Sequence, residues 1–205
     1  MCIASYMLNA ILDFDRSIFL LINNGWANPF NNIIFAGLTL LGSDYVMLPI
    51  VGIAIYIFDR KNFKSNLILI ISALVIGGIL VHILKELVDR PRPLGGMKEL
   101  IKEGKVHINV IFEPLNIVSF PSGHSQTVFT AATILGYTYR KYIYVFFLIA
   151  FFSGISRVYV GAHYPLDVLA GGIIGVGISI AAIYIFKKNG FVVYSNYDSK
   201  GKGVF

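Results

Sequence analysis

Three short polar clusters carry residue types that could bind and transform an oxyanion. They occupy residues 85–93, 119–125 and 156–167, and apolar runs separate them. Among their residues are three cations, two imidazoles and a carboxylate that could act together: Lys85, Arg92, Arg157, His124, His163 and Asp167. Arginine presents a planar fork to phosphate oxygens and lysine adds a point charge. This set of groups therefore favours a dianionic, tetrahedral ligand such as phosphate.

The Ser122-Gly123 pair stands just before one of the apolar runs. Backbone N–H groups at the start of a helix bind anions, and glycine lets the backbone approach a ligand closely. We therefore expect Ser122 and Gly123 to contribute to the same anion site, with His124 beside them.

His163 and Asp167 are four residues apart, at the beginning of the last apolar run. Pro165 suits the first turn of a helix, where its missing N–H costs nothing. His163 then lies just before this helix and Asp167 lies in its first turn, so the two side chains can meet. A carboxylate bonded to one ring nitrogen fixes the tautomer and leaves the other nitrogen as a nucleophile.

These roles predict a covalent mechanism. His163 attacks phosphorus, and protonated His124 gives its proton to the leaving oxygen. Water then hydrolyses the phosphohistidine, with His124 acting as the base. The remaining groups stabilise charge on the equatorial oxygens: Lys85, Arg92, Arg157, Ser122 and Gly123.

The sequence offers no carboxylate cluster of the kind that holds Mg²⁺ and no Cys/His set for Zn²⁺. We therefore predict metal-independent chemistry without a cofactor.

The composition indicates a membrane protein. Of the 205 residues, 56% are hydrophobic and 14% are charged, whereas a soluble domain has about 45–50% apolar and about 25% charged residues. The formal net charge of +6 is explained by basic residues that flank membrane spans rather than by a nucleic-acid partner.

The apolar runs predict an all-α, polytopic membrane helical bundle with about five to six spans. Five candidates are Ile33–Phe58, Asn66–Leu84, Ser122–Tyr139, Tyr142–Ser156 and Leu169–Phe186. Residues 4–24 form a sixth apolar region, which Asp13, Asp15 and Arg16 interrupt. We expect that region to be an interfacial or partly inserted helix.

Three parts follow from this pattern. Residues 1–32 form an N-terminal amphipathic region, residues 33–188 an integral-membrane domain, and residues 189–205 a polar tail. The segment 94–118 is either a solvated connector or a cap that contacts a substrate headgroup.

If each span crosses once, the links 59–64, 140–141 and 187–188 lie on one side of the membrane. They are short and rich in lysine and arginine, which places them in the cytoplasm. The opposite side carries as many basic residues, but in longer segments. The three polar clusters then face the extracytoplasmic side.

Several other polar residues have ordinary interpretations. Arg90 is a flanking cation that could pair with Asp89, and Asp15 belongs to an interfacial polar face. His82 and His107 are interfacial or packed histidines, although His82 could support Lys85. The closely spaced glycines of the last span indicate close helix packing: Gly171, Gly172, Gly175 and Gly177.

The three clusters together resemble the type 2 phosphatidic acid phosphatase (PAP2) superfamily. The matching patterns are Lys85-(six residues)-Arg92-Pro93, Pro121-Ser-Gly-His124 and Ser156-Arg157-(five residues)-His163-(three residues)-Asp167. The resemblance covers roughly residues 33–186 and implies a helical bundle acting on lipid phosphates or diphosphates. It implies that His163 is the nucleophile, Asp167 its partner and His124 the acid/base. The residues that it implies for phosphate binding are Lys85, Arg92, Ser122, Gly123 and Arg157, and Ser156 also matches.

The resemblance therefore implies a membrane phosphatase, in the cell inner membrane if the source is bacterial. Candidate substrates are undecaprenyl diphosphate, phosphatidylglycerol phosphate, phosphatidic acid and a lipid A-type phosphate. Two alternatives stay open: a phosphotransferase that uses a lipid acceptor, and a non-catalytic lipid-phosphate binder or transporter. The superfamily also includes vanadate-binding haloperoxidases, but those are generally soluble and the spans argue against them. The sequence does not predict the oligomeric state.

Overall fold

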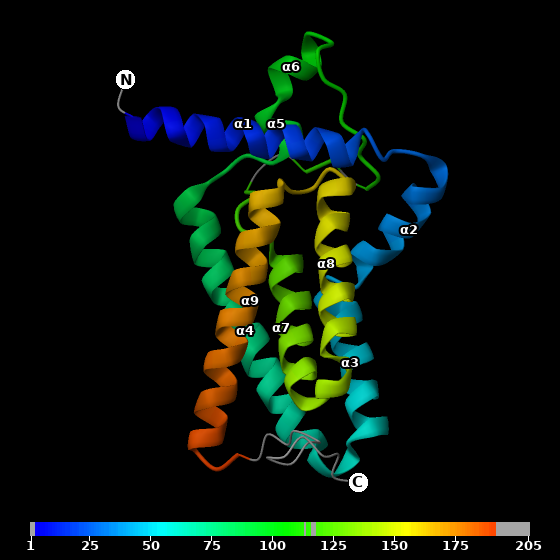
Figure 1. Ribbon diagram of the computed structural model, residues 1–205, viewed down its shortest axis with the longest axis vertical. Helices are drawn as coiled ribbons and strands as arrows, with labels where there is room; N and C mark the ends of the chain where they lie inside the picture. Colours follow the sequence, from blue (N-terminus) through cyan, green and yellow to red (C-terminus); the bar gives the residue numbers. More distant parts are fainter. Residues whose placement is uncertain (1–2, 113, 116–117, 192–205) are drawn as a thin grey trace.

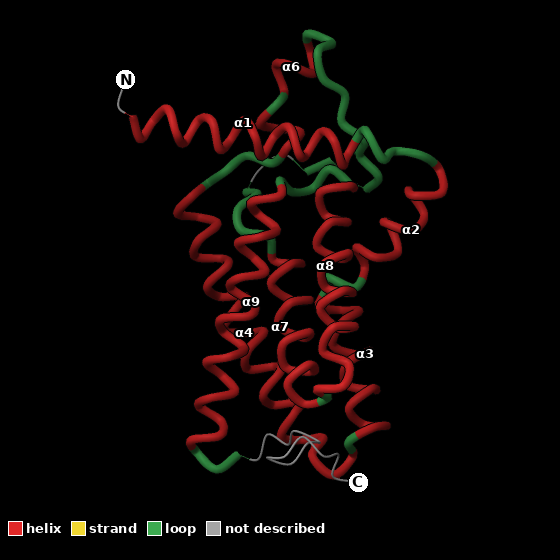
Figure 2. The backbone as a smooth tube through the Cα atoms, viewed as in Figure 1, coloured by secondary structure: helices red, strands yellow, loops and turns green. Residues whose placement is uncertain are grey.

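The computed structural model describes residues 3–112, 114–115 and 118–191, which form helices and loops and no strand (Figure 2). The predicted all-α fold is confirmed. The helices are α1 (Ile3–Asn23), α2 (Pro29–Leu40), α3 (Asp44–Phe58), α4 (Phe63–Val88), α5 (Pro93–Gly96), α6 (Lys98–Lys102), α7 (Gly123–Thr138), α8 (Ile143–Tyr159) and α9 (Pro165–Lys188). Short 3₁₀ turns precede α4 and α8, at Arg60–Asn62 and Arg140–Tyr142. Most of the predicted tail lies outside the described residues.

Helix α7 is the centre of the bundle, with α4, α8 and α9 packed along it (Figure 1). Its polar side chains are buried and find partners inside the protein. Gln126 donates to Thr130 Oγ1 at 3.0 Å, and Thr127 donates to Asp44 Oδ1 of α3 at 2.7 Å. Because α7 itself and the neighbouring α3 satisfy these groups, a helix of only moderate hydrophobicity can occupy the middle of the bundle.

The backbones of α9 and of the start of α7 lie very close together at two glycines of α9. A Cβ atom added at Gly171 would lie 2.2 Å from the Ser122 carbonyl oxygen, and one added at Gly175 would lie 2.5 Å from the Gln126 carbonyl oxygen. Only glycine allows the two backbones to come this near. The predicted close packing holds at both positions. It is wrong for Gly177, where an added Cβ meets no atom within 4 Å.

Three described segments are long and apolar enough to cross a membrane: Arg60–Lys102, which contains α4, Arg140–Tyr159 and Pro165–Lys188. A fourth results if α2 and α3 are counted as one span, although they are bent by 70°. The expected five to six spans are therefore not confirmed. Ile33–Phe58 is not one straight helix, because a turn separates α2 from α3.

Helix α1 lies across the end of the bundle where α4 and α8 end and α9 begins (Figure 1). One face of α1 is buried at a helical spacing, with Asp15, Phe19 and Asn23 exposed by 2%, 0% and 0%. Large apolar side chains such as Phe14 and Leu21 are exposed on other faces. The interpretation of Asp15 as part of an interfacial polar face is therefore wrong, because its side chain is buried against the bundle.

Candidate active site

The structure brings the three polar clusters to the same end of the bundle, beneath α1 (Figure 1). Residues 89–92 follow α4, residues 118–122 precede α7, and residues 160–164 join α8 to α9. The three short basic links lie at the opposite end. The up-and-down order of α4, α7, α8 and α9 produces this separation.

His163 and Asp167 meet at the start of α9. The carboxylate oxygen Oδ2 of Asp167 lies 3.6 Å from His163 Nδ1. The same oxygen accepts hydrogen bonds from Ser119 Oγ at 2.5 Å and from the Tyr164 N–H at 2.9 Å. Ser119 Oγ also lies 3.4 Å from His163 Nδ1. The sequence interpretation gave Ser119 no role, because no spacing rule links it to a residue 44 positions away.

The other ring nitrogen of His163 faces a guanidinium group. Arg92 Nη1 lies 3.4 Å from His163 Nε2 and donates to the Ala162 carbonyl at 3.0 Å. Burial of the imidazole lowers the pKa of His163 to about 3, and the charges of Arg92 and Arg157 act in the same direction. The ring is therefore neutral at physiological pH, so one of its nitrogens carries a free electron pair.

Arg157 lies in the last turn of α8 and is buried, with 8% of its surface exposed. Its Nη1 donates to Thr39 Oγ1 of α2 at 2.7 Å. Its buried Nε has no hydrogen-bond partner among the described residues. An unsatisfied buried donor is costly, and an oxyanion bound here would satisfy it.

Lys85 lies in the last turn of α4 and bends back toward the loop that leads to α7. Its ammonium group donates to the Val118 carbonyl at 2.9 Å. Lys85 also lines a cavity of about 480 Å³ together with Gly123 and His124. The last turn of α4 and the first turn of α7 therefore share one opening.

Ser122 caps α7, and its hydroxyl accepts from the Ser125 N–H at 3.4 Å. Its own N–H donates to the Asp167 carbonyl oxygen at 2.9 Å, which ties the turn to α9. His124 follows in the first turn of α7. It lies close enough to interact electrostatically with Arg157, His163, Arg92 and Lys85.

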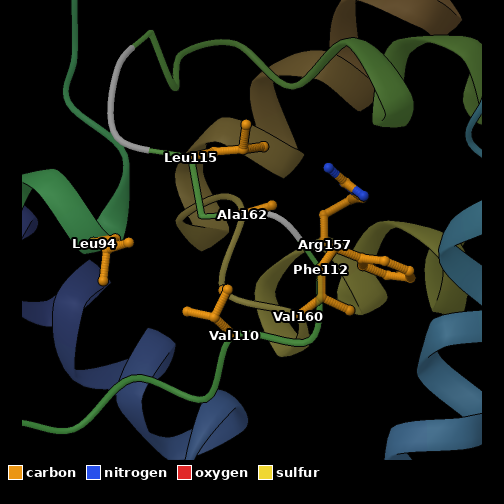
Figure 3. Close-up of a pocket in the computed structure, with 8 residues that line it drawn as sticks. Leu94, Val110, Phe112, Leu115, Arg157, Val160 and Ala162 are labelled. Carbon is orange, nitrogen blue, oxygen red and sulfur yellow. The ribbon is translucent and has the colours of Figure 1, made fainter.

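A smaller cavity of about 80 Å³ lies beside Arg157 (Figure 3). Apolar side chains of the segment 94–118 line it: Leu94, Val110, Phe112 and Leu115. The segment that could cap a headgroup thus lies against one of the cations of the site.

Arg90 does not pair with Asp89, so that interpretation is wrong. Asp89 takes a left-handed conformation (φ 42°) that ends α4. Arg90 instead donates to Asp167 Oδ1 at 2.7 Å and to Asp15 Oδ2 at 2.6 Å. Sequence reasoning missed both contacts because they join residues 77 and 75 positions apart.

Two further histidines are exposed. His82 lines the same cavity of about 480 Å³ as Lys85 and His124, and its Nε2 lies 3.3 Å from the carboxylate of Glu86. His107 is exposed as well. Within the described ranges, no group of three His, Cys, Asp or Glu side chains could hold a metal ion.

Comparison with known proteins places this geometry in context. The model of the PAP2 superfamily matches residues 66–191. The chain is 32% identical over 179 residues to undecaprenyl-diphosphatase of Sulfolobus acidocaldarius, covering 85% of this chain and 79% of the relative. It is 30% identical over 189 residues to phosphatidylglycerophosphatase B of Bacillus subtilis, with coverages of 84% and 83%. The crystal structure of Aquifex aeolicus LpxE superposes with a TM-score of 0.69 at 34% identity, covering 82% of this chain and 93% of that chain.

Proposed function

Because the chain belongs to the PAP2 superfamily and its relatives are named as lipid phosphatases, we propose that it hydrolyses a lipid phosphate or diphosphate monoester through a phosphohistidine on His163. The observation that carries this proposal is the placement of His163. Its Nδ1 faces a buried carboxylate and its Nε2 faces a guanidinium group. The carboxylate orients the imidazole as a nucleophile, and the guanidinium group stabilises the phosphate that the imidazole attacks.

In the first step, the free electron pair of His163 Nε2 attacks phosphorus, and the bond from phosphorus to the lipid oxygen breaks. Asp167 and Ser119 hold the Nδ1 proton, so that Nε2 is the nitrogen with the free pair. The positive charge that develops on the imidazole is stabilised by the carboxylate of Asp167.

His124 supplies the proton that the departing lipid oxygen takes up. Burial disfavours a proton on His124, and the charges of Arg157, Arg92 and Lys85 repel it as well until an anion binds between them. Phosphate binding therefore promotes the acid form at the moment when it is needed. In the second step, neutral His124 removes a proton from water, which attacks phosphorus and releases His163.

The phosphate oxygens bind to the cations and to the turn at the start of α7. Arg92 and Arg157 present guanidinium N–H groups, and the unsatisfied Nε of Arg157 supports this role. Lys85 adds a point charge from the last turn of α4. Ser122 and the Gly123 N–H complete the site at the helix N-terminus.

The lipid itself is proposed only as a class: undecaprenyl diphosphate, phosphatidylglycerol phosphate, phosphatidic acid or a lipid A-type phosphate. The two relatives are named for different lipids, so their names do not select one.

The segment 94–118 contacts the headgroup in this proposal. The apolar side chains that this segment places beside Arg157 support that role. Transfer of the phosphoryl group to a lipid acceptor, or lipid-phosphate binding without catalysis, are the alternatives that the next experiment separates.

Purified protein in detergent should release orthophosphate from at least one of these four lipids, and it should do so equally well in EDTA. Metal-independent release is expected because cations of the protein surround the anion. The measurement is colorimetric detection of released orthophosphate, with and without excess EDTA. Loss of activity in EDTA that added Mg²⁺ restores would overturn the metal-independent mechanism. Phosphate that appears only on an added lipid acceptor would identify a phosphotransferase.

The chain is an integral membrane protein, and we propose that its site faces the extracytoplasmic side, in the inner membrane if the source is bacterial. In a Cys2→Ser background, Glu103→Cys places a thiol on the exposed segment beside the site. Lys141→Cys places the matched control on an exposed basic link at the opposite end. An impermeant maleimide added to intact cells should label position 103 and not position 141. The reverse pattern would put the site in the cytoplasm.

A further inference from the structure

We propose that Arg90 and Asp15 are positioning residues for the active-site carboxylate, so that helix α1 is a working part of the catalytic apparatus. This inference rests on the proposed function of Asp167. Asp15 lies outside the three motifs, and Arg90 occupies the unspecified six-residue spacer of the first one. Arg90 contacts Asp167 and Asp15 rather than His163 or His124.

Arg90 joins two buried carboxylates. Its Nη1 lies 2.7 Å from Asp167 Oδ1 and its Nη2 lies 2.6 Å from Asp15 Oδ2. The side chains of Asp167, Asp15 and Arg90 are exposed by only 0%, 1% and 15%. Hydrogen bonds between charged groups are short and directional, and a buried carboxylate that loses its cation is left uncompensated. Arg90 is therefore what allows Asp167 to remain a buried anion beside the nucleophile.

The two oxygens of Asp167 have different partners. Oδ1 accepts from Arg90, whereas Oδ2 accepts from Ser119 and from the Tyr164 N–H and faces His163 Nδ1. Rotation of the carboxylate would break the bonds on both sides at once. The guanidinium group of Arg90 thus determines which oxygen is presented to the imidazole.

Asp15 fixes Arg90 and the start of α9 together. Its Oδ2 holds Arg90, while its Oδ1 accepts from the Leu166 N–H at 2.9 Å. That N–H belongs to the first turn of α9, where backbone donors have no partner within the helix. The Arg90 guanidinium also stacks 4.1 Å from the centre of the Tyr164 ring. Helix α1 is therefore bonded to the same helix turn that carries Asp167.

This arrangement predicts an effect on turnover rather than on binding, because Arg90 acts through Asp167 and not on phosphate. Arg90→Gln should lower kcat by about 10- to 100-fold while KM changes by less than about threefold. Arg90→Lys, which keeps the charge, should recover part of the loss. Asp15→Asn should lower kcat in the same direction by a smaller factor. Arg16→Gln is the matched control: it removes an exposed cation of α1 that forms an ion pair with the exposed Asp13, and it should leave kcat unchanged.

A double variant separates positioning from general destabilisation. If Arg90 acts through the carboxylate, Arg90→Gln added to Asp167→Asn should lower kcat by less than about threefold beyond Asp167→Asn alone. If Arg90 had a purely structural role, the double variant would show the product of the two separate reductions in kcat. Thermal unfolding in detergent is measured on each variant, and a loss of kcat that merely follows a loss of folded protein would overturn the proposal.

Orthovanadate binding keeps this test independent of the lipid. Vanadate adopts five-coordination and so reports the geometry of attack by His163, whereas orthophosphate reports ground-state binding. Arg90→Gln should weaken vanadate binding, followed by ⁵¹V NMR, by about tenfold and orthophosphate binding by less than about threefold. Vanadate binding by the wild type without release of phosphate from any lipid would defeat the proposed function alone. Phosphate release with an unchanged kcat and vanadate affinity in Arg90→Gln would defeat this inference alone.

Discussion

Replacement of His163 by alanine should reduce phosphate release by at least about 10⁴-fold, because the residual catalysis of a site without its nucleophile comes only from charge stabilisation and binding. The cations that hold phosphate are untouched by this change, so KM for any residual reaction should stay within about threefold. The measurement is release of orthophosphate under steady-state conditions. Lys141→Ala, at an exposed residue of the basic link at the opposite end of the bundle, is the control and should retain wild-type kcat.

The covalent step makes a second observation possible on the same site. In His124→Ala both the acid of the first step and the base of the hydrolytic step are missing. A phosphoenzyme should therefore form slowly from ³²P-labelled lipid and, once formed, persist long enough to be isolated. It should be stable in alkali and labile in acid, as expected for a phosphorus–nitrogen bond. It should be absent from His163→Ala. A label on His124→Ala that survives acid, or equal phosphate release by wild type and His163→Ala, would rule out the phosphohistidine route.

Gly171→Ala should be the most damaging single change outside the charged groups. The added Cβ would lie 2.2 Å from the carbonyl oxygen of Ser122, and a backbone atom cannot yield as a flexible side chain does. Overpacking of this kind costs about 1–3 kcal/mol or more. Because Ser122 also donates to the Asp167 carbonyl, the shift would move the phosphate-binding turn away from α9.

We therefore expect Gly171→Ala to unfold several degrees below the wild type in detergent, with kcat/KM reduced by about tenfold or more in the folded fraction. Gly177→Ala is the matched control on the same helix. An added Cβ meets no atom within 4 Å there, and alanine favours helix over glycine. It should be at least as stable as the wild type. Equal stability and activity of the two variants would contradict the close contact between α7 and α9.

The four-residue spacing of His163 and Asp167, with Pro165 between them, places both at one helix start because helix geometry is local. The apolar runs predicted α4, α8 and α9 for the same reason. The polar clusters at the ends of these runs could then be assigned to one end of the bundle simply by alternating the direction of successive helices.

Other features depended on packing between distant segments. The bend of 70° between α2 and α3 divides what reads as one apolar run, and it brings Gly42 against His124. Ser119 carries no motif of its own, yet it hydrogen-bonds to Asp167 across 48 positions. No periodicity within a single segment can predict such contacts.

Arg90 and Asp15 give the clearest contrast. In the sequence, one is an ordinary cation near a helix end and the other an acid in an amphipathic helix. Their partners are decided only when α1 crosses the end of the bundle and buries Asp15 beside the start of α9. The sequence by itself determined which chemical groups are available and which helices carry them, since these depend on residue type and local spacing. The tertiary structure alone decided which charges neutralise one another, because burial and the meeting of distant segments determine the cost of leaving a charge unpaired.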